Sequence, residues 1–199
     1  IEEFKDSYKK THNKLYYSIE TPTKNKYKFG RTYNDIIKNI GIYKTSALLD
    51  MCVFEKDCDE KKYKRILNIE FKHGNAPLKD IAKDVLKLMR EKEKGAFIFL
   101  LDNTDSGSLN NGSTTRKGVL NKLSESFFKF KGKWEGDKSI QLVIISLDQK
   151  MLIHRTVTCE DLKDTKKRIF SNGTDIGYGN ITSVNGNDWN NYVIDKKEK

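Results

Sequence analysis

The sequence predicts an α/β fold in which helices pack on a mixed β-sheet, and three observations favour this class. Residues 66–72 alternate between apolar and polar side chains, as a half-buried strand does. Residues 78–89 carry apolar side chains at helical spacing, and residues 96–101 form a short apolar run typical of a strand buried on both faces. A helix between two strands favours a right-handed crossover and a parallel strand pair.

The chain of 199 residues is long enough for one domain with a hydrophobic core. We expect a single domain over residues 1–199, with its core at about 30–157 and a C-terminal extension at 158–199. The chain begins with Ile1 rather than Met, so we expect it to be part of a longer protein.

The net charge and the cysteine pattern indicate which kind of partner and which compartment to expect. Lys and Arg number 38 against 28 Asp and Glu, a net charge of +10 that is spread along the chain and suits a polyanion such as nucleic acid. A Lys- and Asn-rich composition without any such partner is the alternative. Cys52, Cys58 and Cys159 form no C-x-x-C pair, which favours a reducing cytoplasm over a disulfide framework or a zinc site. No apolar run approaches ~20 residues, so no membrane span is expected.

The first elements are expected to be short. Residues 1–14 resemble a polar helix or an arm, and residues 15–20 and 26–29 predict two short strands around a turn. Thr32 and Asp35 have the spacing of a capping box before a helix that ends near Gly41.

The centre of the chain predicts a β-hairpin from residues 46–54 and 63–72, joined by a charged loop. Strand alternation is expected to point Leu67, Ile69 and Phe71 into the core and the residues between them away from it. Asn75 is a plausible N-cap for the helix that follows. The later elements expected are a helix at 115–130, strands at 140–147 and 151–157, a short helix at 160–169 and loops at 171–191.

Two carboxylates and a lysine are expected to share one patch of this hairpin. Glu70 and Lys72 lie two residues apart and therefore on one face of a strand, and Asp50 can approach Glu70 from the neighbouring strand. Asp50 interrupts an apolar run, where an unpaired carboxylate is costly. Such a patch could hold a hard cation and activate a water molecule. The alternative is an exposed Glu70–Lys72 ion pair of little energetic value, with Asp50 as a turn residue.

An acid at Asp50, the Glu70-Phe71-Lys72 tripeptide on the next strand, then a helix and an apolar strand together resemble the PD-(D/E)XK nuclease superfamily. The resemblance implies a restriction-endonuclease-like fold, a mixed β-sheet core flanked by helices. It covers residues 34–101 in detail. Leu49 precedes Asp50 where the fuller motif has proline.

The resemblance also implies an activity: hydrolysis of phosphodiester bonds by a Mg²⁺- or Mn²⁺-dependent endonuclease, as in restriction-modification or antiviral defence. Asp50, Glu70 and the backbone carbonyl of Phe71 would ligate the metal. Lys72 would orient or deprotonate the attacking water, or contact the phosphate. Asn68 is a candidate supporting group, and Glu20 and Asp35 are the candidates for a further acid.

DNA is the expected partner, with RNA as an open alternative. Four lysines on and just after the second amphipathic helix form a candidate backbone-binding surface: Lys122, Lys129, Lys131 and Lys133. A homodimer and a fused or partner sensor domain are further open alternatives. Two other functions remain compatible with the sequence, a nucleic-acid-binding module on the same fold that does not cut and a protein-interaction domain.

Overall fold

A computed structural model gives the structure of the chain and describes residues 15–38, 45–56, 62–104, 107–109, 117–163 and 189–193. The expectations for residues 1–14 and for most of 164–191 therefore lie outside the described residues. Seven strands form one sheet in the order β1-β2-β3-β4-β5-β6-β7. Its strands are β1 (Leu15–Tyr27), β2 (Thr45–Lys56), β3 (Tyr63–His73), β4 (Lys94–Leu101), β5 (Ser139–Ser146), β6 (Met151–Thr158) and β7 (Asn190–Val193).

The sheet is mixed, as the sequence predicted. Strand β2 runs antiparallel to β1 and β3, whereas β3, β4 and β5 run parallel to one another. Strand β6 runs antiparallel to β5, and β7 runs antiparallel to β6. The parallel pairs are joined by α3 (Leu78–Arg90) and α4 (Val119–Phe130). The short helices are α2 (Asp35–Lys38) and the 3₁₀ turns η1 (Lys131–Lys133) and η2 (Glu160–Leu162).

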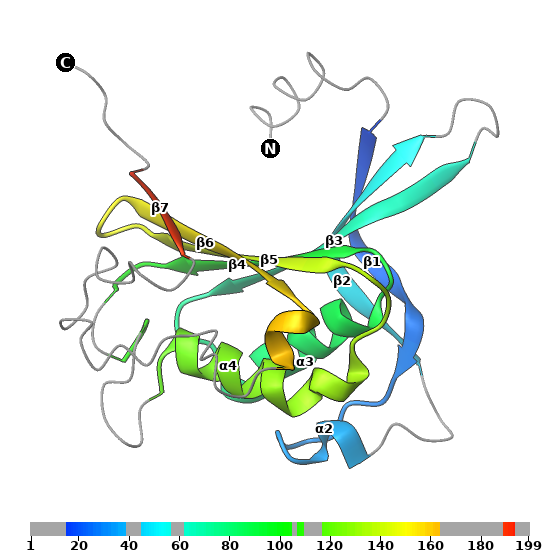
Figure 1. Cartoon of the computed structure of the whole chain (residues 1–199), viewed down its shortest axis with the longest axis horizontal. Coiled ribbons are helices and arrows are strands. Elements are labelled where there is room, and N and C mark those ends of the chain that lie inside the picture. The colour runs from blue at the N-terminus through cyan, green and yellow to red at the C-terminus, as the bar shows by residue number, and fades with distance from the viewer. Residues whose placement is uncertain are drawn as a thin grey trace.

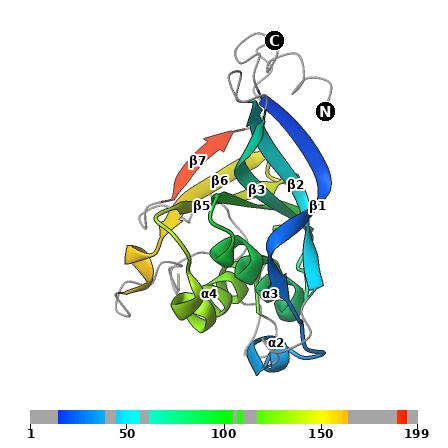
Figure 2. The same cartoon turned by 90° about the vertical axis from the view of Figure 1, so that its right-hand side faces the viewer.

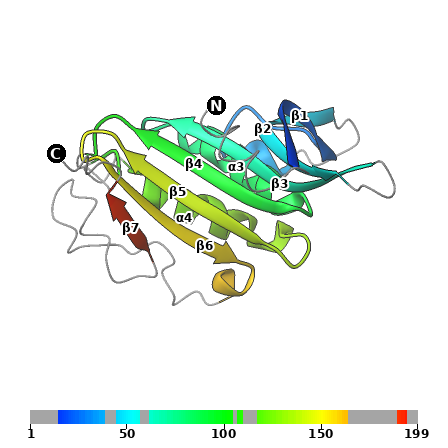
Figure 3. The ribbon, with the colours of Figure 1, turned by 90° about the horizontal axis from the view of Figure 1, so that it is seen from above.

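Helices α3 and α4 cover the same face of the sheet, and α2 lies on their far side (Figure 1, Figure 2). This placement follows from the topology, because two successive right-handed crossovers in one direction put both helices on one side. Viewed from the opposite side, the strands lie in chain order in front of the two helices (Figure 3). Among the described helices, none has the length and apolar composition needed to cross a lipid bilayer.

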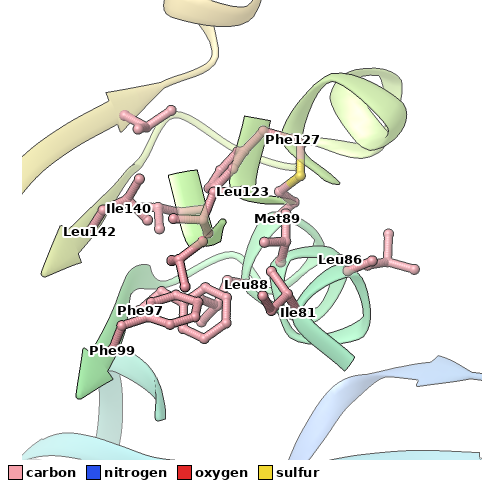
Figure 4. Packing of buried hydrophobic residues seen from close by; sticks show 14 of the residues in the cluster. Ile81, Leu86, Leu88, Met89, Phe97, Phe99, Leu123, Phe127, Ile140 and Leu142 are labelled. Carbon is pink, nitrogen blue, oxygen red and sulfur yellow. The ribbon is translucent and has the colours of Figure 1, made fainter. Parts of the chain in front are cut away.

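The hydrophobic core fills the space between these helices and the central strands (Figure 4). Helix α3 is amphipathic, as its spacing of apolar residues predicted, and α4 packs beside it. The side chains that meet in this layer come from α3, β4, α4 and β5 and are all buried: Ile81, Leu88, Met89, Phe97, Phe99, Leu123, Phe127, Ile140 and Leu142.

Strand β3 faces the opposite way from our expectation. Asn68 and Glu70 are 0 % and 1 % exposed on the helix side, whereas Phe71 is 41 % exposed. Glu70 pairs in register with Phe97 of β4, which is buried under the helices. The alternation was predicted correctly, but periodicity alone does not tell which face the crossover helix will cover. The polar face of β3 is therefore the buried face.

Other boundaries also differ from the expectation. The N-terminal pair of short strands is one 13-residue strand, β1, with a register shift between Pro22 and Lys26. Proline is tolerated there because β1 is at the edge of the described sheet. Asn75 does not cap α3, whose N-cap is Pro77; its side-chain amide instead donates hydrogen bonds to the carbonyls of Gly107 and Lys117. Helix α4 begins at Val119 rather than at residue 115.

Candidate functional site: a buried carboxylate–lysine cluster

Strands β2 and β3 separate in the middle of the sheet. Their ladder runs from Lys56 and Tyr63 to the pair Met51 and Ile69, although both strands continue beyond that pair. Residues 45–49 go on to pair with β1, and residues 70–73 go on to pair with β4. A gap therefore opens between β2 and β3 at the positions of Asp50 and Glu70.

Asp50 occupies this gap with its side chain. The Asp50 Oδ2 atom accepts a hydrogen bond of 2.7 Å from the backbone N–H of Phe71, and the residue itself is exposed. A side-chain carboxylate thus takes the place that a backbone carbonyl has in a continued ladder. The bond fixes Asp50 beside Glu70, and its second oxygen has no hydrogen-bond partner among the described residues.

Glu70 lies beneath the gap and is almost wholly buried. Its Oε1 atom is 2.6 Å from Lys87 Nζ, while its Oε2 atom has no hydrogen-bond partner in the part of the chain that the structure describes. Burial and the negative charge of Asp84 raise the pKa of Glu70 to about 9, against the opposing effect of Lys87. An additional cation beside Glu70 would stabilise its charged carboxylate, which burial and Asp84 disfavour.

Two residues of α3, Asp84 and Lys87, complete the site and were missed by the sequence interpretation. The Lys87 Nζ atom is 2.8 Å from Asp84 Oδ1 and donates a 2.8 Å hydrogen bond to the carbonyl of Leu48 on β2. Both side chains are only 8 % exposed. The available signal was their position: the two charges lie one turn apart on the helix face that also carries Ile81 and Leu88.

Lys72 is the accessible cation of the site. Its Nζ atom forms an ion pair with Asp84 Oδ2 and lies 3.4 Å from the carbonyl oxygen of Phe71. The side chain is 22 % exposed, so it reaches the surface while Glu70 does not. We call Asp50, Glu70, Lys72, Asp84 and Lys87 the carboxylate–lysine cluster. Fully ionised, its three carboxylates and two lysines carry a net charge of −1.

The three candidate accessory residues lie in different parts of the structure. Asn68 is on the face of Glu70, but its amide accepts from Cys52 Sγ at 3.3 Å and donates to Glu93 at 3.4 Å. Glu20 lies across β1–β2 from Asp50 with a backbone φ of +47°. Asp35 accepts a 2.6 Å hydrogen bond from the Thr32 hydroxyl at the start of α2, beyond the helix layer (Figure 2). The third carboxylate of the cluster is thus Asp84, and Asp35 belongs to a different part of the molecule.

The four candidate DNA-contacting lysines also differ from one another. Lys122 Nζ donates to Asn75 Oδ1 at 2.5 Å and to the Ala76 carbonyl at 2.8 Å, so it fixes the loop before α3. Lys129 Nζ lies 3.6 Å from the centre of the Tyr33 ring. Lys131 and Lys133, in η1 directly after α4, are both exposed.

A groove of about 710 Å³ opens beside the cluster. It is lined by Tyr27 at the end of β1 and the two residues after it, by residues 45–48 of β2, and by Lys83, Asp84 and Lys87 of α3. Two members of the cluster therefore form part of its wall.

The cluster suits the magnesium ion that the family resemblance implies. Within the described part of the chain, no three His, Cys, Asp or Glu side chains gather closely enough to hold a metal by themselves. Among the described residues, Asp50 and Glu70 nevertheless each keep one carboxylate oxygen without a hydrogen-bond partner, and the fully ionised cluster carries a net charge of −1. Mg²⁺ is commonly held by one or two carboxylates with water completing its shell. The donors present therefore fit a hard cation.

No protein-family model, curated protein or solved structure matches this chain. The class that the fold and site define is an α/β protein with a mixed, helix-covered sheet. Its distinguishing feature is a carboxylate–lysine cluster at a gap between two central strands.

Proposed function

We propose that the chain is a metal-dependent nuclease domain with a restriction-endonuclease-like fold, and that it hydrolyses phosphodiester bonds in DNA. One observation carries this proposal: the β2–β3 ladder ends immediately before Asp50 and Glu70, and leaves both carboxylates at the gap. The Glu-x-Lys strand is followed by a helix and a parallel strand, in the order that the resemblance implies.

Each residue of the cluster has a distinct part in this proposal. Asp50, Glu70 and the Phe71 carbonyl would hold the metal. A bound Mg²⁺ supplies an activated water and stabilises negative charge at the phosphate. Lys72, ion-paired to Asp84 and partly exposed, contacts a phosphate oxygen or orients the water. Asp84 is a positioning residue, because it holds the Lys72 ammonium at the edge of the gap.

The test is incubation of the purified chain with plasmid DNA in Mg²⁺ or Mn²⁺, beside an EDTA control. We expect metal-dependent cutting by the wild type. Asp50→Ala, Glu70→Gln and Lys72→Gln should each lower cutting at least 100-fold, in line with the loss of one metal ligand or charge-stabilising group. Lys83→Gln is the matched control, since Lys83 is also on α3 but its Nζ atom lies 5.6 Å from the Phe29 ring and 3.6 Å from Asp80, which is outside the cluster.

DNA binding is measured in parallel by a salt titration. Asp50→Ala should bind DNA as the wild type does, because the change removes a metal ligand and no positive charge. Cutting that persists in Asp50→Ala and Glu70→Gln would contradict the proposed site. Loss of cutting in Lys83→Gln to the same degree would point to a general effect on folding.

A second function is favoured by one observation, the ion pair between Glu70 and Lys87. A lysine that neutralises the central carboxylate is compatible with a nucleic-acid-binding module that does not cut. Salt-sensitive DNA binding without cutting in either metal, by a chain that remains folded, would favour this second function.

A further inference from the structure

The Lys87 ammonium lies where a cation has three oxygen neighbours. Glu70 Oε1 is 2.6 Å from Nζ, and Asp84 Oδ1 and the Leu48 carbonyl oxygen are each 2.8 Å from it. These oxygens come from three different elements, β3, α3 and β2. Protein oxygens surround Ca²⁺ at about 2.3–2.6 Å, so a shift of a few tenths of an ångström would turn this arrangement into metal ligation.

The oxygens around Lys87 Nζ could neutralise more positive charge than one ammonium supplies. Glu70 is 1 % exposed, and its Oε2 atom has no hydrogen-bond partner among the described residues. A buried carboxylate oxygen without a partner is costly. A divalent ion could engage both oxygens of Glu70, which a single ammonium on Oε1 does not.

Lys87 also has a place to which it can move. Its side chain forms part of the wall of the 710 Å³ groove between α3 and the first half of β2. An extended lysine has several rotatable bonds and favours hydration of its ammonium. Rotation into the groove would free Glu70, Asp84 and the Leu48 carbonyl together.

We propose that Glu70, Asp84 and the Leu48 carbonyl form a divalent-cation seat, and that the Lys87 ammonium fills this seat until a metal displaces it into the groove. The inference rests on the proposed function only in treating Glu70 as a metal ligand. It adds Asp84 and Leu48 to the ligands and makes Lys87 a competitor of the metal. It also predicts that removal of Lys87 strengthens metal binding and that this gain depends on Asp84, a dependence that a purely structural role of Lys87 does not require.

The first experiment measures Mn²⁺ and Ca²⁺ binding by calorimetry, without DNA. Lys87→Met should bind either ion at least tenfold more tightly than the wild type. Adding Asp84→Asn to Lys87→Met should remove that gain. Lys83→Met, one turn away on the same groove, should leave the affinity unchanged. Equal affinity of wild type and Lys87→Met would overturn the proposal, and so would a gain that survives Asp84→Asn.

A second experiment uses the unaltered chain, because Lys87→Met leaves two buried carboxylates with one less cation and could impair folding. Lysines are acetylated with an amine-reactive reagent over a series of Mn²⁺ concentrations, and modification is read by peptide mass spectrometry. Labelling of Lys87 should rise severalfold with Mn²⁺, while labelling of Lys83 stays constant. No rise for Lys87 at any concentration would overturn the proposal.

The two proposals can fail separately. Tight, Asp84-dependent metal binding by Lys87→Met without any DNA cutting would support the cation seat and contradict the nuclease. Metal-dependent cutting with unchanged Lys87 labelling would support the nuclease and contradict the cation seat.

Discussion

Glu70 couples the charge state of the cluster to the stability of the fold. Burial and the charge of Asp84 raise its pKa from 4.5 to about 9, so the folded chain holds a proton that the unfolded chain releases. The stabilisation is fully present below pH 4.5 and is lost as the pH rises through 9. Between these values the unfolding free energy of the wild type should fall, relative to Glu70→Gln, by up to about 1.4 kcal/mol per pH unit.

Urea unfolding at several pH values between about 5 and 9 measures this effect. Glu93→Gln is the control. Burial acts to raise the pKa of Glu93, but hydrogen bonds from Lys24 and Asn68 lower it overall. Its contribution is therefore lost only on acidification, outside the window tested. A constant difference between wild type and Glu70→Gln across the window would show that Lys87 keeps Glu70 ionised.

At the scale of single residues, the sequence predicted the part of the cluster that depends on local geometry. Strand alternation puts Glu70 and Lys72 on one face, and the hairpin brings Asp50 beside them. Asp84 and Lys87 were not predicted, because their contacts depend on how α3 lies across the sheet. That docking is set by many non-local apolar contacts, and no spacing within the chain encodes it directly.

At the scale of elements, the connection from β1 into α2 depends on the close approach of two backbone segments. A Cβ atom built on Gly30 would lie 2.3 Å from the Asp35 Cβ and 2.7 Å from the Asp35 carbonyl oxygen. Gly30→Ala should therefore lower the unfolding free energy by about 1–3 kcal/mol, since backbone must shift to admit the methyl group.

Thermal or urea unfolding of this variant tests the contact. Gly132→Ala is the matched control, because a Cβ at Gly132 meets no atom within 4 Å and η1 accepts alanine. Its stability should stay within about 0.5 kcal/mol of the wild type. If Gly30→Ala is equally neutral, the approach of Asp35 is looser than the structure describes.

The elements that the sequence predicted best have strong periodicity. The hairpin, α3, β4, β5 and β6 were all expected, and the parallel pairing of β3 with β4 is confirmed. The single long β1 was not expected, because Pro22 and the polar residues around it resemble a turn. Strand β7 has four residues in a segment rich in Asn and Gly, too short for a recognisable alternation.

At the scale of the whole molecule, the net charge of +10 predicts salt-dependent binding to nucleic acid. Affinity for a labelled DNA duplex, measured by fluorescence anisotropy, should fall linearly in a plot of log K against log salt concentration. Replacing both Lys131 and Lys133 by Gln should reduce the slope by about two, if each contacts one phosphate.

Lys122→Gln is the control for this measurement. The Lys122 ammonium is engaged by Asn75 and Ala76 within the chain, so its loss should leave the salt slope unchanged and lower stability instead. A slope that falls equally for Lys122→Gln would place the DNA elsewhere on the molecule. A flat slope for the wild type would remove support from both nucleic-acid functions and favour a protein-interaction domain.

The hydrogen bond from Phe71 N–H to Asp50 has a consequence for how this domain could diverge in evolution. Asp50 satisfies a backbone donor at a break in the sheet, so selection for folding alone would retain it in a descendant without the proposed nuclease activity. Glu70 gives the fold little in return for its burial, and an apolar residue could replace it together with Lys87. In a lineage of such chains, retention of Glu70, more than of Asp50, would therefore mark the members that have the proposed nuclease activity.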